Sequence, residues 1–209
     1  MTAPTMAEAA ALLKNKDPAL AVLIEEHGPP PRRKPVPVGR RFGSLAEIIV
    51  YQQLAGNAAA AIHGRFESAL GGTVSPEAVL AAPPAALTSS GLSGTKAASI
   101  RDLAERVASG EIELDRMGRL SDEAVVEHLT RVRGIGPWTA HMFLLGTLGR
   151  LDVWPVGDYG VRAGFGRAWG MAEIPTPKEL MPLGEPFRPY RSLVAWYCWR
   201  VVDDRTART

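Results

Sequence analysis

The chain has 209 residues, of which 46% are apolar, so it is long enough to bury a sizeable core. Its 24 Lys and Arg residues nearly balance 22 Asp and Glu residues, and this bulk charge gives only a faint indication of a polyanionic partner. The single cysteine, Cys198, excludes an internal disulfide, a cysteine-built zinc site and a four-cysteine iron–sulfur cluster.

The amino-terminal residues 1–20 lack a basic flank that leads into an apolar segment, and no uninterrupted apolar run approaches membrane-spanning length. We therefore expect neither an export signal nor a membrane anchor. The sequence is typical of a cytoplasmic protein.

Helical patterning begins near residue 4, with one helix to about Lys14 and a second from Asp17, where Pro18 suits the first helical position. Residues 29–41 (PPPRRKPVPVGRR) then interrupt the periodicity with five prolines and five basic residues. We interpret this segment as an extended connector, either a solvated linker or a loop that touches a DNA backbone.

Ser44 is predicted to open the next helix, because Glu47 completes a capping box. An apolar stripe follows over 45–70, with Gly56 and Asn57 as a point of division. Ser121 and Thr176 are predicted to cap two further helices, and Thr95 a third. The other helices are expected over 76–81, 84–88, 138–148, 159–169 and 190–202. No segment alternates like a strand, so we predict an all-α fold.

Residues 132–139 (VRGIGPWT) join two predicted helices by a very short turn. Gly134 and Gly136 allow positive φ and expose their amides, while Pro137 can open the second helix without losing a donor. Such a turn offers several N–H groups and a helix dipole to one phosphate, although a plain αα-hairpin that needs glycine for close packing is the alternative. No strand precedes the turn and no Gly-Lys-Ser/Thr follows it, which excludes dinucleotide-binding and P-loop motifs.

Residues 121–165 resemble the helix-hairpin-helix DNA glycosylases of the HhH-GPD superfamily, in which a Gly/Pro-rich loop and an essential aspartate follow the hairpin. Here the loop reads Pro155-Val156-Gly157-Asp158. Within the superfamily, the chain is most similar to the 3-methyladenine DNA glycosylase II type. The resemblance extends from about Ser44 to the carboxy terminus through Tyr51-Gln52-Gln53-Leu54, Gly91-Leu92 with Lys96-Ala97, and Pro189-Tyr190-Arg191-Ser192 leading to Trp199.

The resemblance implies one glycosylase domain over 1–209, built from two helical lobes with an active-site cleft between them. One lobe would comprise 44–150, with the hairpin at 132–137, and the other 1–43 together with 151–209. Neither an iron–sulfur cluster nor an amino-terminal β domain is expected. Bifunctional members have a nucleophilic lysine where this chain has Trp138, so the resemblance implies a monofunctional enzyme.

Asp158 is the predicted catalytic residue. Cleavage of an N-glycosidic bond builds positive charge on the deoxyribose, which a fixed carboxylate can stabilise while it orients the attacking water. Alkylated purines already carry positive charge and leave readily, which explains a lone aspartate. The alternative, that Asp158 caps the helix from Tyr159, is compatible with catalysis.

By the same resemblance, Gln53 is the wedge that fills the gap left by the flipped base, supported by Gln52; a solvated helix break is the alternative. Four aromatic residues and one methionine fit either the base pocket or the core. The pocket candidates are Trp138, Tyr159, Trp199, Tyr51 and Met142. The candidates for binding the DNA backbone are Gly134, Ile135, Gly136 and Thr139. The resemblance further implies that the carbonyls of Thr130, Val132 and Ile135 hold Na⁺ or K⁺.

The predicted function is hydrolysis of the N-glycosidic bond of alkylated purines, of the 3-methyladenine class, in duplex DNA. The base would be flipped from the stack, and its release would initiate base excision repair. The chemistry needs no cofactor, and the expected partner of the monomeric protein is double-stranded DNA with damaged bases. The alternatives are a non-catalytic DNA-binding module and a bifunctional glycosylase/lyase.

Overall fold

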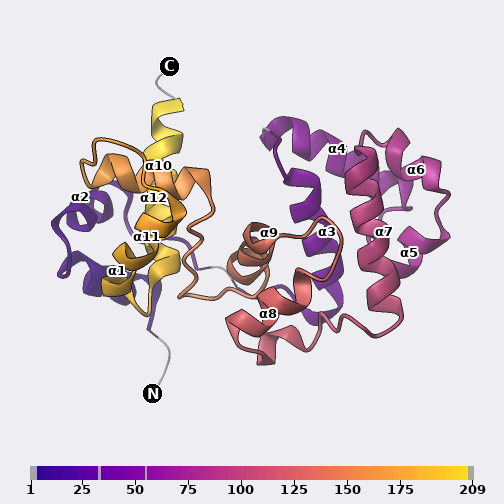
Figure 1. The fold of residues 1–209 in the computed structure, drawn as a ribbon, viewed down its shortest axis with the longest axis horizontal. Coiled ribbons are helices and arrows are strands. Elements are labelled where there is room, and N and C mark those ends of the chain that lie inside the picture. Colours follow the sequence, from indigo (N-terminus) through magenta and orange to yellow (C-terminus); the bar gives the residue numbers. More distant parts are fainter. Residues whose placement is uncertain (1–3, 33, 55, 207–209) are drawn as a thin grey trace. The chain divides into compact units, whose positions relative to one another are not determined.

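The computed structural model describes residues 4–32, 34–54 and 56–206, the last three of these by their backbone only (Figure 1). Throughout these ranges the regular structure is helical and no strand is present, which confirms the all-α prediction. The chain divides into two compact units. The terminal unit comprises residues 1–34 and 150–209, and the central unit comprises residues 35–149.

The terminal unit is built around the pair formed by α10 and α12, which lie side by side (Figure 1). Its core includes Leu13, Leu20, Val161, Tyr197 and Cys198, each with no exposed surface. The elements of this unit are α1 (Met6–Lys14), α2 (Pro18–His27), α10 (Tyr159–Ala168), α11 (Pro177–Leu183), η4 (Glu185–Phe187) and α12 (Arg191–Thr206).

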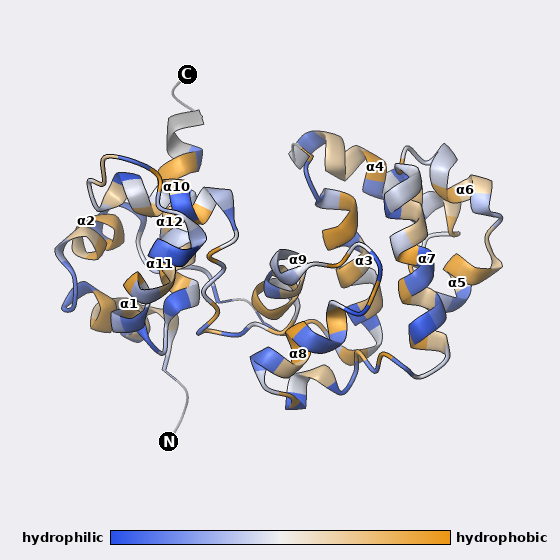
Figure 2. Ribbon diagram, viewed as in Figure 1, coloured by the Kyte–Doolittle hydropathy of each residue, from blue (hydrophilic) through white to orange (hydrophobic). Residues whose placement is uncertain are grey.

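The central unit packs α7 against α3 and α5. The apolar residues of α3, orange in Figure 2, include Leu45 and Ile49, which are fully buried together with Ile100 and Leu103 of α7. The elements of this unit are η1 (Val38–Arg40), α3 (Arg41–Tyr51), α4 (Gly56–Ala69), α5 (Pro76–Ala81), α6 (Pro84–Ser89), α7 (Gly94–Ala108), η2 (Met117–Arg119), α8 (Asp122–Leu129), α9 (Pro137–Met142) and η3 (Phe143–Thr147).

Most predicted helix starts are confirmed by capping hydrogen bonds. Asp17 accepts from the amide of Leu20, and Ser121 caps α8 in the same way. Thr176 forms the predicted capping box with Glu179, whose carboxylate accepts from the Thr176 amide at 2.8 Å. The break at Gly56 is also confirmed, because α3 ends at Tyr51 and α4 begins at Gly56.

The predicted helix start at Ser44 is wrong, since α3 begins at Arg41. The side chain of Arg41 is buried, and its Nη1 donates to the carbonyls of Leu114 at 3.0 Å and Asp115 at 2.9 Å. These bonds to a distant loop hold the start of the helix, while the Ser44 hydroxyl is hydrogen-bonded to that of Thr147 at 2.7 Å. Residues 35–43, which the sequence placed with the amino-terminal lobe, therefore group with the central unit.

Two further predictions differ in detail. Ser93, and not Thr95, caps α7 by accepting from the amide of Lys96 at 3.3 Å. The helix predicted over 138–148 is α-helical only as far as Met142 and continues as the π-helical turn η3. Across the residues that the structure describes, no helix is both long and apolar enough to cross a bilayer.

Candidate functional site

The hairpin of the central unit joins α8 to α9, and of its two glycines Gly134 has the positive φ that the sequence allowed, whereas Gly136 has φ −98°. Gly134 has φ of 72°, and Gly136 begins α9 as its N-cap, with Pro137 at the first helical position. Gly134 is exposed, whereas Ile135 is buried. The turn therefore presents backbone at the N-terminus of α9, where the helix dipole favours an anion.

Helix α7 supports the back of this hairpin, a role that the sequence analysis missed. Asp102 accepts a hydrogen bond from the Arg133 amide at 2.8 Å and is paired with Arg106 at 3.0 Å. A Cβ at position 134 would lie 2.2 Å from the hydroxyl of Ser99, so only glycine fits there. Ser99 and Asp102 are three residues apart on α7 and hence on one face, which is the signal that could have identified them.

The predicted wedge segment is a tight turn at the end of α3. The Leu54 amide donates to the Tyr51 carbonyl at 3.3 Å, Gln52 has φ −50° and ψ 128°, and Gln53 has φ 53°. These values correspond to a type II turn with Gln53 at the position that favours glycine or asparagine. Leu54, at the end of this turn, is 38% exposed, and the sequence analysis did not name it as a wedge candidate.

The turn is attached to the hairpin through Gln52. Its side-chain amide donates to the Gly134 carbonyl at 3.2 Å and to the Thr139 hydroxyl at 2.9 Å. Thr139 is buried, so this residue, predicted to contact the DNA backbone, forms part of the hairpin's internal support. The structure thus brings the predicted wedge and the predicted phosphate-binding turn together in one unit.

In the terminal unit, Asp158 is the N-cap of α10, which the sequence analysis gave as an alternative compatible with catalysis, and it is only 9% exposed. Its Oδ1 accepts from the Val161 amide at 2.8 Å and from Nε1 of Trp199 at 2.9 Å. Trp199 was predicted as a pocket aromatic, and that role stays a prediction; the structure shows that its indole donates to the carboxylate. These two donors fix the orientation of the carboxylate before any substrate is bound.

Close packing of α10 on α12 brings Trp199 to Asp158. A Cβ at Gly164 would lie 2.0 Å from the carbonyl oxygen of Cys198, so the two backbones are nearly in contact. A Cβ at Gly160 would lie 2.9 Å from Cδ1 of Trp199 and 3.1 Å from Oδ1 of Asp158. The i, i+4 glycine spacing is visible in the sequence and is the signal that could have predicted this close contact.

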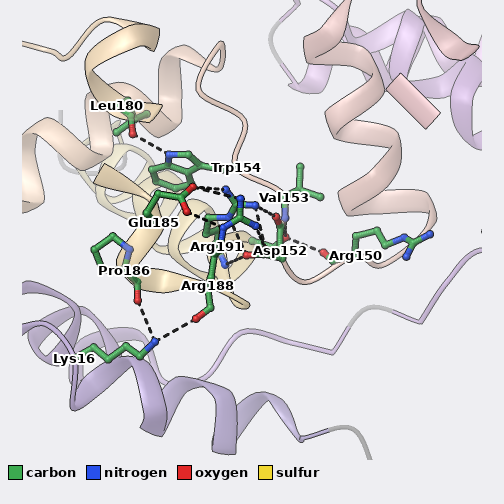
Figure 3. A network of polar contacts seen from close by, with 11 residues as sticks. Lys16, Arg150, Asp152, Val153, Trp154, Leu180, Glu185, Pro186, Arg188 and Arg191 are labelled. Carbon is green, nitrogen blue, oxygen red and sulfur yellow. Dashed lines mark hydrogen bonds and ion pairs between the residues drawn. The ribbon is translucent and has the colours of Figure 1, made fainter. Parts of the chain in front are cut away.

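The polar network drawn in Figure 3 holds the other end of the loop that leads to Asp158. Arg191 donates to Asp152 through Nε at 2.8 Å and Nη2 at 3.0 Å, and Arg188 donates to the same carboxylate at 2.7 Å. Ser192 donates to the Arg150 carbonyl at 2.8 Å. Asp152 is therefore a structural residue, and α12 supports the loop at both ends.

The remaining pocket candidates differ in exposure. Tyr159 is 62% exposed, and the guanidinium carbon of Arg162 lies 5.7 Å from its ring centroid, a cation–π distance. Trp138, Tyr51 and Met142 are half-buried in the central unit. Two other tryptophans belong to the core of the terminal unit: Trp154 is buried in the core cluster, and Trp169 packs against the cluster and stacks on Phe165 with ring centroids 4.0 Å apart.

Of the candidate cation ligands, Thr130 is the C-cap of α8, and Val132 and Ile135 lie in the hairpin. The Val132 carbonyl accepts from the Ile135 amide at 3.1 Å, and a carbonyl oxygen has a second lone pair for a cation. The described residues contain no group of three or more His, Cys, Asp or Glu side chains arranged to bind a metal ion. The carbonyl-bound Na⁺ or K⁺ stays a prediction.

Burial also determines the chemistry of Cys198, which lies one residue before Trp199. Burial raises the pKa of this free thiol, and the nearby charge of Asp158 raises it further. The thiol is therefore protonated and unreactive at neutral pH. Burial likewise raises the pKa of Tyr197 to about 12, and its hydroxyl donates to the Gly28 carbonyl at 2.9 Å.

Comparison with known proteins gives consistent results. DNA-3-methyladenine glycosylase 1 of Schizosaccharomyces pombe is 34% identical over 162 residues, which cover 76% of this chain and 71% of that protein. The DNA-3-methyladenine glycosylase of Saccharomyces cerevisiae is 32% identical over 78% of this chain and 58% of its own length.

Solved structures show the same relationship. The Schizosaccharomyces pombe 3-methyladenine DNA glycosylase in complex with abasic DNA superposes with a TM-score of 0.84, at 31% identity, over 92% of this chain and 95% of that chain. A Bacillus halodurans DNA-3-methyladenine glycosidase gives 0.81 at 34% identity, over 95% and 91%. The model of the HhH-GPD superfamily matches residues 46–189, which include the hairpin and Asp158. The chain therefore belongs to the HhH-GPD superfamily of base excision DNA repair proteins.

Proposed function

We propose that this protein is a monofunctional DNA glycosylase that hydrolyses the bond between deoxyribose and an alkylated purine of the 3-methyladenine class in duplex DNA. The observation that carries the proposal is the fixed, nearly buried carboxylate of Asp158 in a chain of this superfamily. The names of its relatives support the substrate class.

The proposed reaction breaks the bond between the sugar C1′ and the base nitrogen. The alkylated base leaves as a neutral purine because it already carried the positive charge, and the sugar becomes oxocarbenium-like. Asp158 stabilises that charge and orients a water molecule, which adds to C1′ and releases a proton. Since Val161 and Trp199 hold Oδ1 before the reaction, little reorganisation is needed.

Strand cleavage is not part of the proposal. A lyase reaction through a Schiff base requires an amine at the sugar, and the second residue of α9 is Trp138, where the bifunctional relatives described above have lysine. The expected products are a free base and an intact strand with an abasic site.

DNA binding is assigned to the central unit. The amides of Gly134 and Gly136 would bind a backbone phosphate at the N-terminus of α9. The Ile135 amide, which was also predicted to contact the phosphate, is already bonded to the Val132 carbonyl. A Na⁺ or K⁺ ion on the nearby carbonyls would assist. The turn that carries Gln53 and the exposed Leu54 would fill the space left by the flipped base, for which an apolar side chain is suited.

The test is base release from methylated duplex DNA by the wild type, by Asp158→Asn and by Asp115→Asn, an exposed aspartate of the central unit. Asparagine retains the helix cap, so Asp158→Asn should fold and bind DNA while its rate of base release falls by about 10²–10³-fold or more. Asp115→Asn should match the wild type. Full activity of Asp158→Asn would refute the assignment of this residue.

The same experiment separates the other functions. DNA binding without base release from any of 3-methyladenine, 7-methylguanine, 1,N6-ethenoadenine and hypoxanthine would indicate a non-catalytic module. A covalent adduct trapped by borohydride would indicate a lyase.

A further inference from the structure

Lys96 has an unusual position in the central unit. It lies in the first turn of α7, where the helix dipole disfavours a cation. Its Nζ donates to two carbonyls, those of Val50 and Gln52, each at 2.7 Å. Both carbonyls belong to the C-terminal end of α3, where they have no partner within the helix and where the dipole of α3 favours a cation. Partial burial lowers the pKa of Lys96.

The Gln52 carbonyl, which accepts from Lys96, belongs to the turn that follows α3. Type I and type II turns differ mainly by a flip of their central peptide, which in this turn carries the carbonyl of Gln52 and the amide of Gln53. With Lys96 as donor, that carbonyl points toward α7 and Gln53 adopts its φ of 53°. A glutamine strongly disfavours this conformation, which persists only when surrounding contacts hold it.

Gln52 is held at both its backbone and its side chain. Lys96 donates to the backbone carbonyl of Gln52. The side-chain amide of Gln52 donates to the Gly134 carbonyl and the Thr139 hydroxyl of the hairpin. Loss of the Lys96 contact would leave the side chain attached but would allow the central peptide to flip. Gln53 could then relax to a negative φ, and the exposed side chains of Gln53 and Leu54 would change direction.

We infer that Lys96 is a positioning residue for base extrusion, which acts by holding the wedge turn in its type II form and not by touching DNA. The inference rests on the proposed function, because it assigns the turn at 51–54 to the flipping step. It predicts a defect that is confined to substrates in which the base must be extruded from a duplex.

The experiment compares base release by the wild type and Lys96→Met on methylated duplex DNA and on methylated single-stranded DNA. A base in a single strand needs little unstacking or unpairing, so the Met variant should lose about 10- to 100-fold in kcat/KM on the duplex and much less on the single strand. Lys14→Met, which removes an exposed lysine paired with Glu25 in the terminal unit, should change neither rate.

Two measurements distinguish this role of Lys96 from a direct phosphate contact and from a loss of folding. A lysine that contacted a phosphate would contribute about one unit to the slope of log affinity against log salt concentration, so this slope should be unchanged in Lys96→Met. Equal loss on both substrates, or a slope reduced by about one, would overturn the inference. If the Met variant does not fold, as judged by its thermal midpoint, Lys96→Gln replaces it with the same expected result.

A binding measurement separates this inference from the proposed function. On the Asp158→Asn background, 2-aminopurine placed next to an abasic-site analogue reports wedge insertion without any chemistry. Lys96→Met should reduce this fluorescence change, and an unchanged signal would count against the inference even if the wild type is an active glycosylase. A reduced signal together with no base release by the wild type would refute the proposed function alone.

Discussion

Trp199→Phe is expected to separate positioning of the catalytic carboxylate from packing of the terminal unit. The substitution removes the Nε1 donor that lies 2.9 Å from Oδ1 of Asp158 but leaves an aromatic ring on α12. The hydrogen bond from the Val161 amide remains, so Asp158 would still cap α10.

The expected change in kcat of Trp199→Phe follows from two opposing effects. A hydrogen bond to a charged group contributes about 1.5–3 kcal/mol, and if all of it orients the carboxylate in the transition state, kcat falls by about 10- to 150-fold. Loss of the donor also leaves more negative charge on Oδ1, which favours the oxocarbenium-like sugar. Because Asp158 is nearly buried, water replaces the lost donor poorly, and we expect orientation to dominate, with a decrease in kcat of at least about tenfold.

The assay is single-turnover release of alkylated base, together with affinity for DNA that contains an abasic-site analogue, which should be unchanged. Trp196→Phe is the matched control, because Trp196 lies on the same helix and makes ring contacts with His27 and Tyr197. A kcat for Trp199→Phe equal to that of the wild type, or an equal loss in both variants, would refute the positioning role of the indole.

Three further outcomes are expected. Gly164→Ala should lower the free energy of unfolding in urea by about 3 kcal/mol or more, because the added Cβ would meet the Cys198 backbone. Gly64→Ala on α4, where nothing lies within 4 Å of the added Cβ, should raise that free energy by about 0.5–1 kcal/mol. Equal effects of the two substitutions would contradict the close packing of α10 on α12. The pKa of Cys198 is higher in the folded protein than in the unfolded chain. The stability that this difference contributes is fully present below about pH 8.5, the pKa of an unfolded cysteine, and is lost as the pH rises above that value. Urea unfolding at pH 7 and pH 9.5 should therefore show a smaller decrease in Cys198→Ala than in the wild type. Asp102→Ala should weaken binding to abasic-analogue DNA by about tenfold, because the Arg133 amide loses its acceptor; unchanged affinity would exclude this support of the hairpin.

Features of the fold that depend on neighbours in the sequence were predicted well. Asp158, Ser121 and Thr176 cap their helices through amides three residues away, so a short pattern contains both partners. The Gly-Ile-Gly hairpin was predicted for the same reason, since positive φ at Gly134 is a local property.

The errors and omissions concern partners that are distant in the sequence. Ser44 has the pattern of an N-cap, but Arg41 starts the helix because it reaches carbonyls more than 70 residues away. Lys96 is part of a motif in the sequence, yet only the structure shows its two acceptors on α3. The indole of Trp199 is similarly invisible as a partner of Asp158, 41 residues earlier. The roles assigned to the wedge, the pocket and the cation ligands stay predictions.

The glycines of α10 also bear on the order in which the protein becomes active. Gly160, Gly164 and Gly166 each weaken the intrinsic stability of a ten-residue helix, by about 1 kcal/mol per glycine. An isolated helix of that length is already marginal in water, so α10 gains its helical form largely by docking on α12. During synthesis α12 emerges after every other described helix. Asp158 therefore reaches its hydrogen-bonded position only in the final stage of folding. Hydrogen exchange should show α10 and α12 opening as one cooperative unit.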